Sequence, residues 1–209
     1  MAKKKRQPPK KSPKAGPGKA PKRTRSKPEP PAGLPDRRAL EGIMRNLVGG
    51  LSDDPPAPDT PLAQAQEVVD KAFGQPDPKK RAKLAKQALD LSPDCADAYT
   101  LLAEQAKSRN ERADLYEQAV AAAERALGPE TFQEGVGHFW LLLETRPYMR
   151  AREALAHTLW TLGRREEAAN HLREMLRLNP GDNQGVRYTL ASWLLDLDQD
   201  EVLAPLLKE

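Results

Sequence analysis

Two ten-residue segments of the chain follow one pattern. They read AKQALDLSPD, from Ala85 to Asp94, and LREMLRLNPG, from Leu172 to Gly181. The matched positions are Leu89 with Leu176, Leu91 with Leu178, and Pro93 with Pro180. Each segment has the apolar spacing of a helix and stops at a proline, which cannot continue a helix. Because self-similarity at a fixed period identifies repeat architectures, we expect stacked pairs of antiparallel helices, each about 34 residues long.

From Thr60 onward, short Ala- and Leu-rich segments alternate with Pro, Gly and Asp. Thr60 before Pro61 and Asp77 before Pro78 are typical helix starts, since the side-chain oxygen caps free backbone N–H groups and proline fits the first helical position. These signals predict helices at 60–74 and 77–94. Further helices are expected at about 94–108, 110–127, 147–162, 164–178, 182–196 and 199–207. No segment alternates as a strand would, so the predicted fold class is all-α.

The repeat pattern resembles the tetratricopeptide repeat (TPR) family. In that family, a large residue and Leu-Ala occupy the first helix, Gly the turn, small residues the second helix, and Pro closes the unit. The unit at 149–182 matches through Leu155, Ala156, Leu159, Gly163, Ala168, Leu172 and Pro180. Other units are placed at about 62–95, 96–129 and 183–209, with an insertion at 130–148. The resemblance implies a short TPR-type α-solenoid over residues 60–209, in which about three stacked repeats are needed for stability.

Four further segments carry a narrower resemblance. GHFW, ETRPYMRAR, GRREEA and MLRLNPGDNQGVRY together look like a distinct group of TPR proteins, which includes bacterial members similar to the suppressor-of-tumorigenicity family. This resemblance covers roughly residues 60–209. It implies a scaffold or adaptor, since no catalytic motif defines such proteins.

The N-terminal region, residues 1–59, has a different composition. Residues 1–28 hold twelve Lys or Arg and no acidic residue, and thirteen of the twenty prolines lie in residues 1–61. A segment so poor in apolar groups is predicted to be disordered. It is interpreted as a solvated tail, as a non-specific contact for nucleic acid or the ribosome, or, in a eukaryote, as a nuclear-import signal at KKKR. The candidate polyanion contacts are Lys3, Lys4, Lys5, Arg6, Lys10, Lys11, Lys22, Arg23 and Arg25.

A short amphipathic helix is predicted within this arm, at 36–48. Asp36 is its expected N-cap, and glycines at 49 and 50 end it. Its apolar stripe consists of Leu40, Ile43, Met44 and Leu47, at i, i+3, i+4 and i+7. As an amphipathic helix beside a groove, it is hypothesised to dock in the protein's own groove or in a neighbour's. The alternative is a nascent helix that docks nowhere.

The TPR resemblance also places one stripe of each first helix along a peptide-binding groove. Carried over by position, the groove candidates are Thr100, Glu104, Lys107, Arg150, Glu153, His157, Trp160, Arg187 and Ala191. The alternative for these positions is a solvated polar face. Trp140, Trp160 and Trp193 lie at apolar helical spacings, which favours packing over a ligand platform. The expected partner of the groove is a protein or peptide, and the expected function is a non-catalytic scaffold.

Several function classes find no support in the sequence. His138, His157 and His171 are not spaced as a ligand pair on one helix, and we expect no enzyme activity, cofactor or metal. Cys95 stands alone and is predicted to be buried, which favours a reducing, cytoplasmic location, or a nuclear one in a eukaryote. No apolar run is long enough to span a membrane, so no membrane partner is expected. The apolar C-terminal leucines suggest either a shortened array or self-association through that end.

Overall fold

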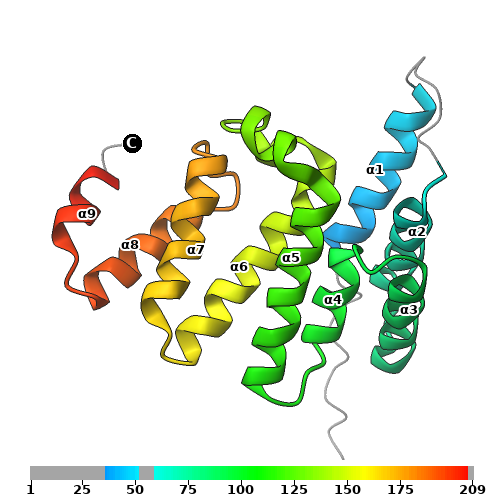
Figure 1. Cartoon of the computed structure of the whole chain (residues 1–209), viewed down its shortest axis with the longest axis horizontal. Helices are drawn as coiled ribbons and strands as arrows, with labels where there is room; N and C mark the ends of the chain where they lie inside the picture. Colours follow the sequence, from blue (N-terminus) through cyan, green and yellow to red (C-terminus); the bar gives the residue numbers. More distant parts are fainter. Residues whose placement is uncertain (1–35, 52–58, 207–209) are drawn as a thin grey trace, which may run out of the picture. The chain divides into compact units, whose positions relative to one another are not determined.

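The computed structural model describes residues 36–51 and 59–206. The chain divides into two units, Met1–Gly33 and Leu34–Glu209, and the described elements all belong to the second. Every one of these elements is helical, as the sequence predicts (Figure 1). They are α1 (Arg37–Leu51), α2 (Pro61–Phe73), α3 (Pro78–Leu91), α4 (Ala96–Ala103), α5 (Arg109–Glu134), the short 3₁₀ helices η1 (Phe139–Leu141) and η2 (Leu143–Thr145), α6 (Arg146–Thr161), α7 (Arg165–Leu178), α8 (Val186–Asp196) and α9 (Asp200–Leu206).

The predicted helix starts are confirmed in their chemistry. The Thr60 hydroxyl accepts a hydrogen bond from the Ala63 N–H at 3.1 Å, and the Asp77 carboxylate accepts one from the Lys79 N–H at 2.9 Å. Both satisfy backbone donors that lack a partner in the first helical turn. These caps fix where α2 and α3 begin, and so fix the register of their apolar faces.

Successive helices pack as neighbours: α2 with α3, α4 with α5, and α6 with α7, while α8 follows α7 (Figure 1). Small side chains permit this close packing, because alanines lie fully buried where two helices meet, such as Ala85 in α3 and Ala168 in α7. Leucines fill the remaining space, as Leu155 does in α6 at 2% exposure. The first helices α4 and α6 also contact each other, which connects one pair to the next.

Several element boundaries differ from the sequence prediction: α1, expected at 36–48 and ended by glycines, continues to Leu51, and the helix expected at about 94–108 ends as α4 at Ala103. The helix expected at 110–127 breaks at Gly128, where φ is +70°, and a second helical segment that begins at Pro129 continues to Glu134 within α5. The helix expected from 182 starts at Val186. The Asp182 carboxylate nevertheless accepts hydrogen bonds from the backbone N–H groups of Val186 and Arg187, at 2.8 and 3.1 Å. Asp182 therefore caps α8 from a turn that precedes it.

The buried side chains form two clusters. One lies among α2, α3 and α4 and includes Val69, Phe73 and Leu101. The other extends from α4 to α8 and contains the largest buried residues, including Tyr148 and Leu172. The predicted packing role of Trp140 and Trp193 is confirmed by exposures of 8% and 7%. Among the described helices, none has the length and apolar character needed to cross a membrane.

Candidate functional site

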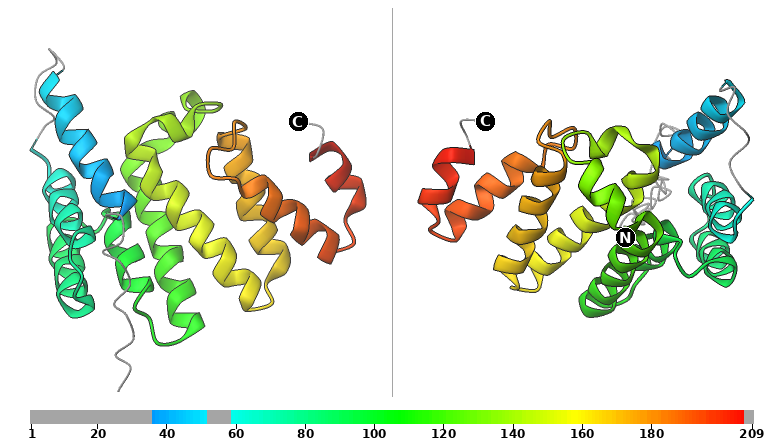
Figure 2. Two further views of the ribbon diagram at one scale, coloured as in Figure 1. Left: turned by 180° about the vertical axis from the view of Figure 1, so that it is seen from behind. Right: turned by 45° about the horizontal axis from the view of Figure 1, so that its top comes forward.

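Helix α1 lies against the first helices of the helix pairs. It packs beside α2, and the end at which it begins lies close to α6 (Figure 2). Apart from Ala39, which packs against the core, the described side chains that α1 directs at these helices are polar. They are Arg38, Glu41 and Arg45, spaced one helical turn apart.

Glu41 is the most deeply buried charged residue of α1, at 6% exposure. One carboxylate oxygen accepts a hydrogen bond from Arg146 at 3.2 Å, and the other accepts one from Arg150. Both arginines belong to α6. Arg150 also donates to Asp97 of α4 at 2.8 Å, and the Asp97 side chain is fully buried. The result is a chain of four alternating charges that joins α1, α6 and α4.

Arg38 and Arg45 make ion pairs on either side of Glu41. Arg38 donates to Glu104, which follows α4, at 2.5 Å, and Arg45 donates to Asp70 of α2 at 2.9 Å. The charges therefore alternate on both sides of the contact. Glu104 faces Arg38, Arg146 and Arg150 face Glu41, and Asp70 faces Arg45. We call the receiving surface, made of Asp70, Asp97, Glu104, Arg146 and Arg150, the α1 seat.

The electrostatics of the α1 seat depend on the charges that α1 supplies. Burial alone lowers the pKa of Arg150, but the carboxylates of Asp97 and Glu41 outweigh it and raise that pKa, so Arg150 stays charged. Burial raises the pKa of Asp70, and the nearby Asp97 carboxylate raises it further, while Gln66 and Arg45 lower it. If α1 left the seat, the Asp70 and Asp97 carboxylates would lie close together without Arg45 to neutralise them. The Arg146 and Arg150 guanidinium groups would likewise lie close together without Glu41.

The groove candidates from the sequence occupy three kinds of place. Glu104 and Arg150 lie in the α1 seat. Thr100 is 4% exposed and therefore lies in the interior, and Lys107 lies exposed in the loop after α4. The remaining candidates lie on α6 and α8, beyond the seat. They are Glu153, His157, Trp160, Arg187 and Ala191.

An aromatic cluster joins α6 to α8. The rings of Trp160 and Trp193 stack with centroids 4.4 Å apart and planes 5° apart, and His157 meets Trp193 edge-on at 5.3 Å. The guanidinium of Arg165 lies 5.0 Å from the Trp160 ring centroid. Glu153 accepts a hydrogen bond from Gln184 at 2.8 Å, and Arg187 donates to the carbonyl oxygens of Leu206 and Pro180. These candidates tie neighbouring elements together.

The face by which α1 docks differs from the expected one. The sequence hypothesis used the apolar stripe, yet Leu40, Ile43, Met44 and Leu47 are 43% to 62% exposed. The charged face docks instead, because the surfaces of α2, α4 and α6 present complementary charges there. Sequence reasoning missed Asp70, Asp97 and Arg146 as well, since Asp70 and Arg146 pair with α1, and Asp97 pairs with Arg150, across as many as 105 positions of the chain. The detectable signal was the spacing Arg38, Glu41, Arg45 on one helical face.

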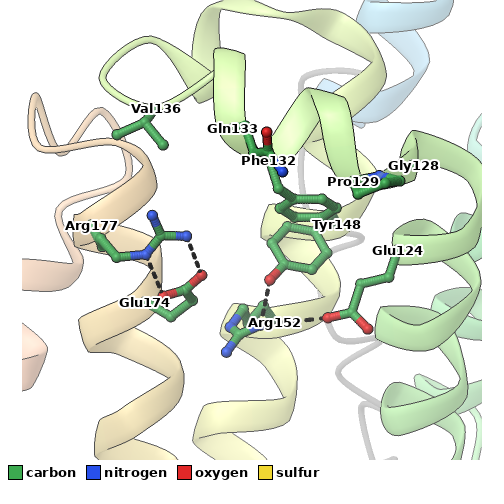
Figure 3. Close-up of a pocket in the computed structure, with 10 residues that line it drawn as sticks. All are labelled: Glu124, Gly128, Pro129, Phe132, Gln133, Val136, Tyr148, Arg152, Glu174 and Arg177. Carbon is green, nitrogen blue, oxygen red and sulfur yellow. Dashed lines mark hydrogen bonds and ion pairs between the residues drawn. The ribbon is translucent and has the colours of Figure 1, made fainter.

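A second site is a pocket of about 860 Å³ beside α5, α6 and α7 (Figure 3). Phe132 and Tyr148 form an aromatic wall, with ring centroids 5.0 Å apart. The Tyr148 hydroxyl points at Arg152, which also lies 3.8 Å from Glu124 (Figure 3). Burial raises the pKa of Tyr148 to about 12, although Arg152 opposes it, so the hydroxyl stays protonated near neutral pH. The arrangement suits packing of an apolar or aromatic group.

The remaining candidates from the sequence are the Cys95 thiol, possible metal ligands and the basic residues near the N-terminus. Cys95 is fully buried, as predicted, and burial with the nearby Asp97 carboxylate raises its thiol pKa to about 12. Its thiol therefore stays protonated and unreactive. Within residues 36–51 and 59–206, no cluster of three His, Cys, Asp or Glu side chains is placed to hold a metal ion. The nine basic residues proposed for polyanion contact, from Lys3 to Arg25, lie outside the described residues.

Comparison with known proteins agrees with the narrower resemblance. Proteins described as suppressor of tumorigenicity 7 protein-like, from Homo sapiens and Bos taurus, are each 32% identical to this chain over 123 residues, and the one from Gallus gallus is 31% identical. The alignment covers 57% of this chain and 21% to 22% of each relative, so the chain spans about a fifth of the length of these curated relatives. No solved structure matches the chain. Residues 58–180 match the family model described as ST7 protein, and the chain therefore belongs to the ST7 protein family.

Proposed function

We propose that this protein is a non-catalytic interaction adaptor whose α1 seat binds a helical segment. One observation carries the proposal: a helix with complementary charges already occupies the seat, with Glu41 buried between Arg146 and Arg150. Binding an amphipathic helix across neighbouring helices is a recurrent mode of peptide recognition. The helix pairs and their small-residue contacts further support a TPR-type array, whose first helices line the binding surface in that family.

The test measures binding of a helix in trans. A fluorescein-labelled peptide of residues 36–51 is titrated with full-length protein carrying Glu41→Ala, which frees the seat by removing the buried carboxylate of the chain's own α1. We expect saturable anisotropy changes, and about tenfold weaker binding for the same peptide carrying Glu41→Gln, because a truncated buried charge pair weakens association. A peptide of equal composition in scrambled order is the control. Equal binding of all three peptides would contradict the proposal.

A second function is supported by the charge of residues 1–28. Their twelve cations without an acidic residue form an attractor for polyanions, and we propose non-specific contact with nucleic acid. The affinity of full-length protein for single-stranded RNA should then fall steeply with salt. Replacing the nine named Lys and Arg residues by Gln should flatten that dependence. The control is a variant in which nine exposed Lys and Arg residues of 59–206 are replaced by Gln instead. If the control loses as much of the salt dependence of RNA binding, the contact belongs to the helical region.

A further inference from the structure

The face of α1 that meets the seat carries a compact pattern. Arg38, Glu41, Gly42 and Arg45 lie at i, i+3, i+4 and i+7, which places them on one side of the helix. Each charge meets an opposite charge, at Glu104, at Arg146 with Arg150, and at Asp70. The pattern Arg-x-x-Glu-Gly-x-x-Arg is therefore a complement to the seat, position by position.

Gly42 shows that the fit is also steric. A Cβ atom at this position would lie 2.7 Å from an Asp70 carboxylate oxygen and 3.1 Å from the Asp70 Cβ. The first distance is shorter than a real contact, so a larger residue would push Asp70 away from Arg45. The seat thus requires a small residue directly after the acidic one.

Few apolar contacts hold α1 in place among the side chains that the structure describes. Ala39 packs partly against the core and Arg38 lies over the Phe73 ring, but Leu40, Ile43, Met44 and Leu47 are exposed. Salt weakens ion pairs near the surface, such as Arg38–Glu104 and Arg45–Asp70, more than the buried pair of Glu41 with Arg150. Elements with few buried apolar contacts open at the lowest free energy. Helix α1 has the features of a bound segment that can leave while the helices beneath it stay folded.

We propose that α1 is an exchangeable internal ligand, and that the external partner is a helix presenting Arg, Glu, a small residue and Arg at positions i, i+3, i+4 and i+7. This inference rests on the proposed function, since it requires the α1 seat to bind helices. The acidic residue of the partner takes the place of Glu41, because without it Arg146 loses its ion pair with Glu41 and Arg150 is left with its pair to Asp97. The two arginines of the partner form ion pairs with Glu104 and Asp70, as Arg38 and Arg45 do.

The experiment detects the departure of α1 in the full chain. The sequence has one cysteine, Cys95, which is fully buried, so a spin label can be attached at an introduced Met44→Cys site, a position 48% exposed. Unlabelled peptide of residues 36–51 is then added. We expect the label to gain mobility in a saturable way as peptide is added. The salt concentration is held fixed between about 50 and 300 mM for the comparison, because salt screens both the contact of α1 with the seat and that of the peptide.

Peptides with single changes supply the matched controls. Glu41→Gln and Gly42→Val peptides should each need about tenfold more peptide to release the label, since one loses the buried charge pair and the other meets Asp70. A Leu40→Ser peptide, changed on the exposed stripe, should act like the unmodified one. Release that is equal for all four peptides would overturn the proposed pattern.

Three other outcomes are informative. If the peptide binds the Glu41→Ala protein but leaves the label of the otherwise unchanged chain immobile, the proposed function stands and exchange is wrong. If it binds neither, both are wrong. If unlabelled full-length protein releases the label and sedimentation shows dimers, the occupant is the α1 helix of a second copy, which overturns an external partner.

Discussion

At the residue scale, the clearest feature is that buried charged side chains form ion pairs with one another. Arg150 bridges Glu41 and Asp97, and Arg152 lies beside Tyr148 and Glu124. Removing one member of a buried pair leaves an uncompensated charge, which costs more than the pair itself contributes. Single substitutions at such positions are therefore more disruptive than substitutions at exposed pairs such as Arg177 with Glu174.

Leu155 tests the packing of α6. Its side chain is 2% exposed in the larger core cluster, so Leu155→Ala should lower the free energy of unfolding by about 2–5 kcal/mol through lost burial and a cavity. Leu141→Ala, at a position 67% exposed, should change it by about 0.5 kcal/mol or less. Urea unfolding followed by circular dichroism measures both. Equal midpoints for the two variants would place Leu155 outside the core.

His171 tests the pH dependence of stability. Burial lowers its pKa from 6.5 to about 4, helped by the charge of Arg152. The unfolded chain binds a proton at His171 below about pH 6.5, whereas the folded chain does not until about pH 4, so stability falls through this window as pH falls. His171→Gln should lose less stability than the unmodified protein between pH 7 and pH 5, measured by urea unfolding. Parallel losses in the two proteins would show that other groups carry the dependence.

At the element scale, the bounds of a helix depend on local sequence signals and on the side chains against which the helix packs. Helix α5 bends at Gly128 and ends at Glu134, and beyond it Phe139 packs against Phe132 with ring centroids 5.3 Å apart. The buried Thr145 hydroxyl donates to the Phe139 carbonyl, which closes the segment between α5 and α6. This segment, predicted as an insertion at 130–148, is built from buried aromatic residues and therefore contributes to the core.

Gly135 tests that closure. A Cβ atom there would lie 2.7 Å from the Thr131 carbonyl oxygen and 2.9 Å from the Phe139 ring, so Gly135→Ala should cost about 1–3 kcal/mol of stability. Gly74→Ala is the control, because its nearest neighbour would be 3.8 Å away and the backbone there is already helical. That change should be neutral or stabilise by about 0.5 kcal/mol. Thermal unfolding compares them, and a loss in Gly74→Ala as large as in Gly135→Ala would contradict the steric explanation.

At the scale of the described helical region, the two core clusters divide the stabilising contacts between neighbouring helices. Residues of α2 and α3 bury their apolar side chains together with α4, while α6, α7 and α8 bury theirs in the other cluster. Contacts between neighbours make stability local, since each helix depends mainly on the helices beside it. Helices that are far apart in this region are therefore expected to open separately.

Val69 tests this locality. Val69 is fully buried in α2, so Val69→Ala should speed amide exchange in α2 and α3 by about tenfold or more, with little change in α7 and α8. Leu190→Ala, in α8, is the reciprocal variant and should do the opposite. Hydrogen exchange with mass spectrometry resolves the two regions. A uniform increase over all helices in both variants would indicate one cooperative unit instead.

The sequence by itself determined the helical class, the helix starts at Thr60 and Asp77, the stops before Pro93 and Pro180, and the burial of Cys95, because caps, prolines and apolar spacing act within a few residues of one another. Only the tertiary structure decided how α1 docks. Its apolar stripe was readable, but which face meets the protein depends on charges brought from α2, α4 and α6. Those charges lie up to 109 positions away in the chain, and no local pattern reports that they converge.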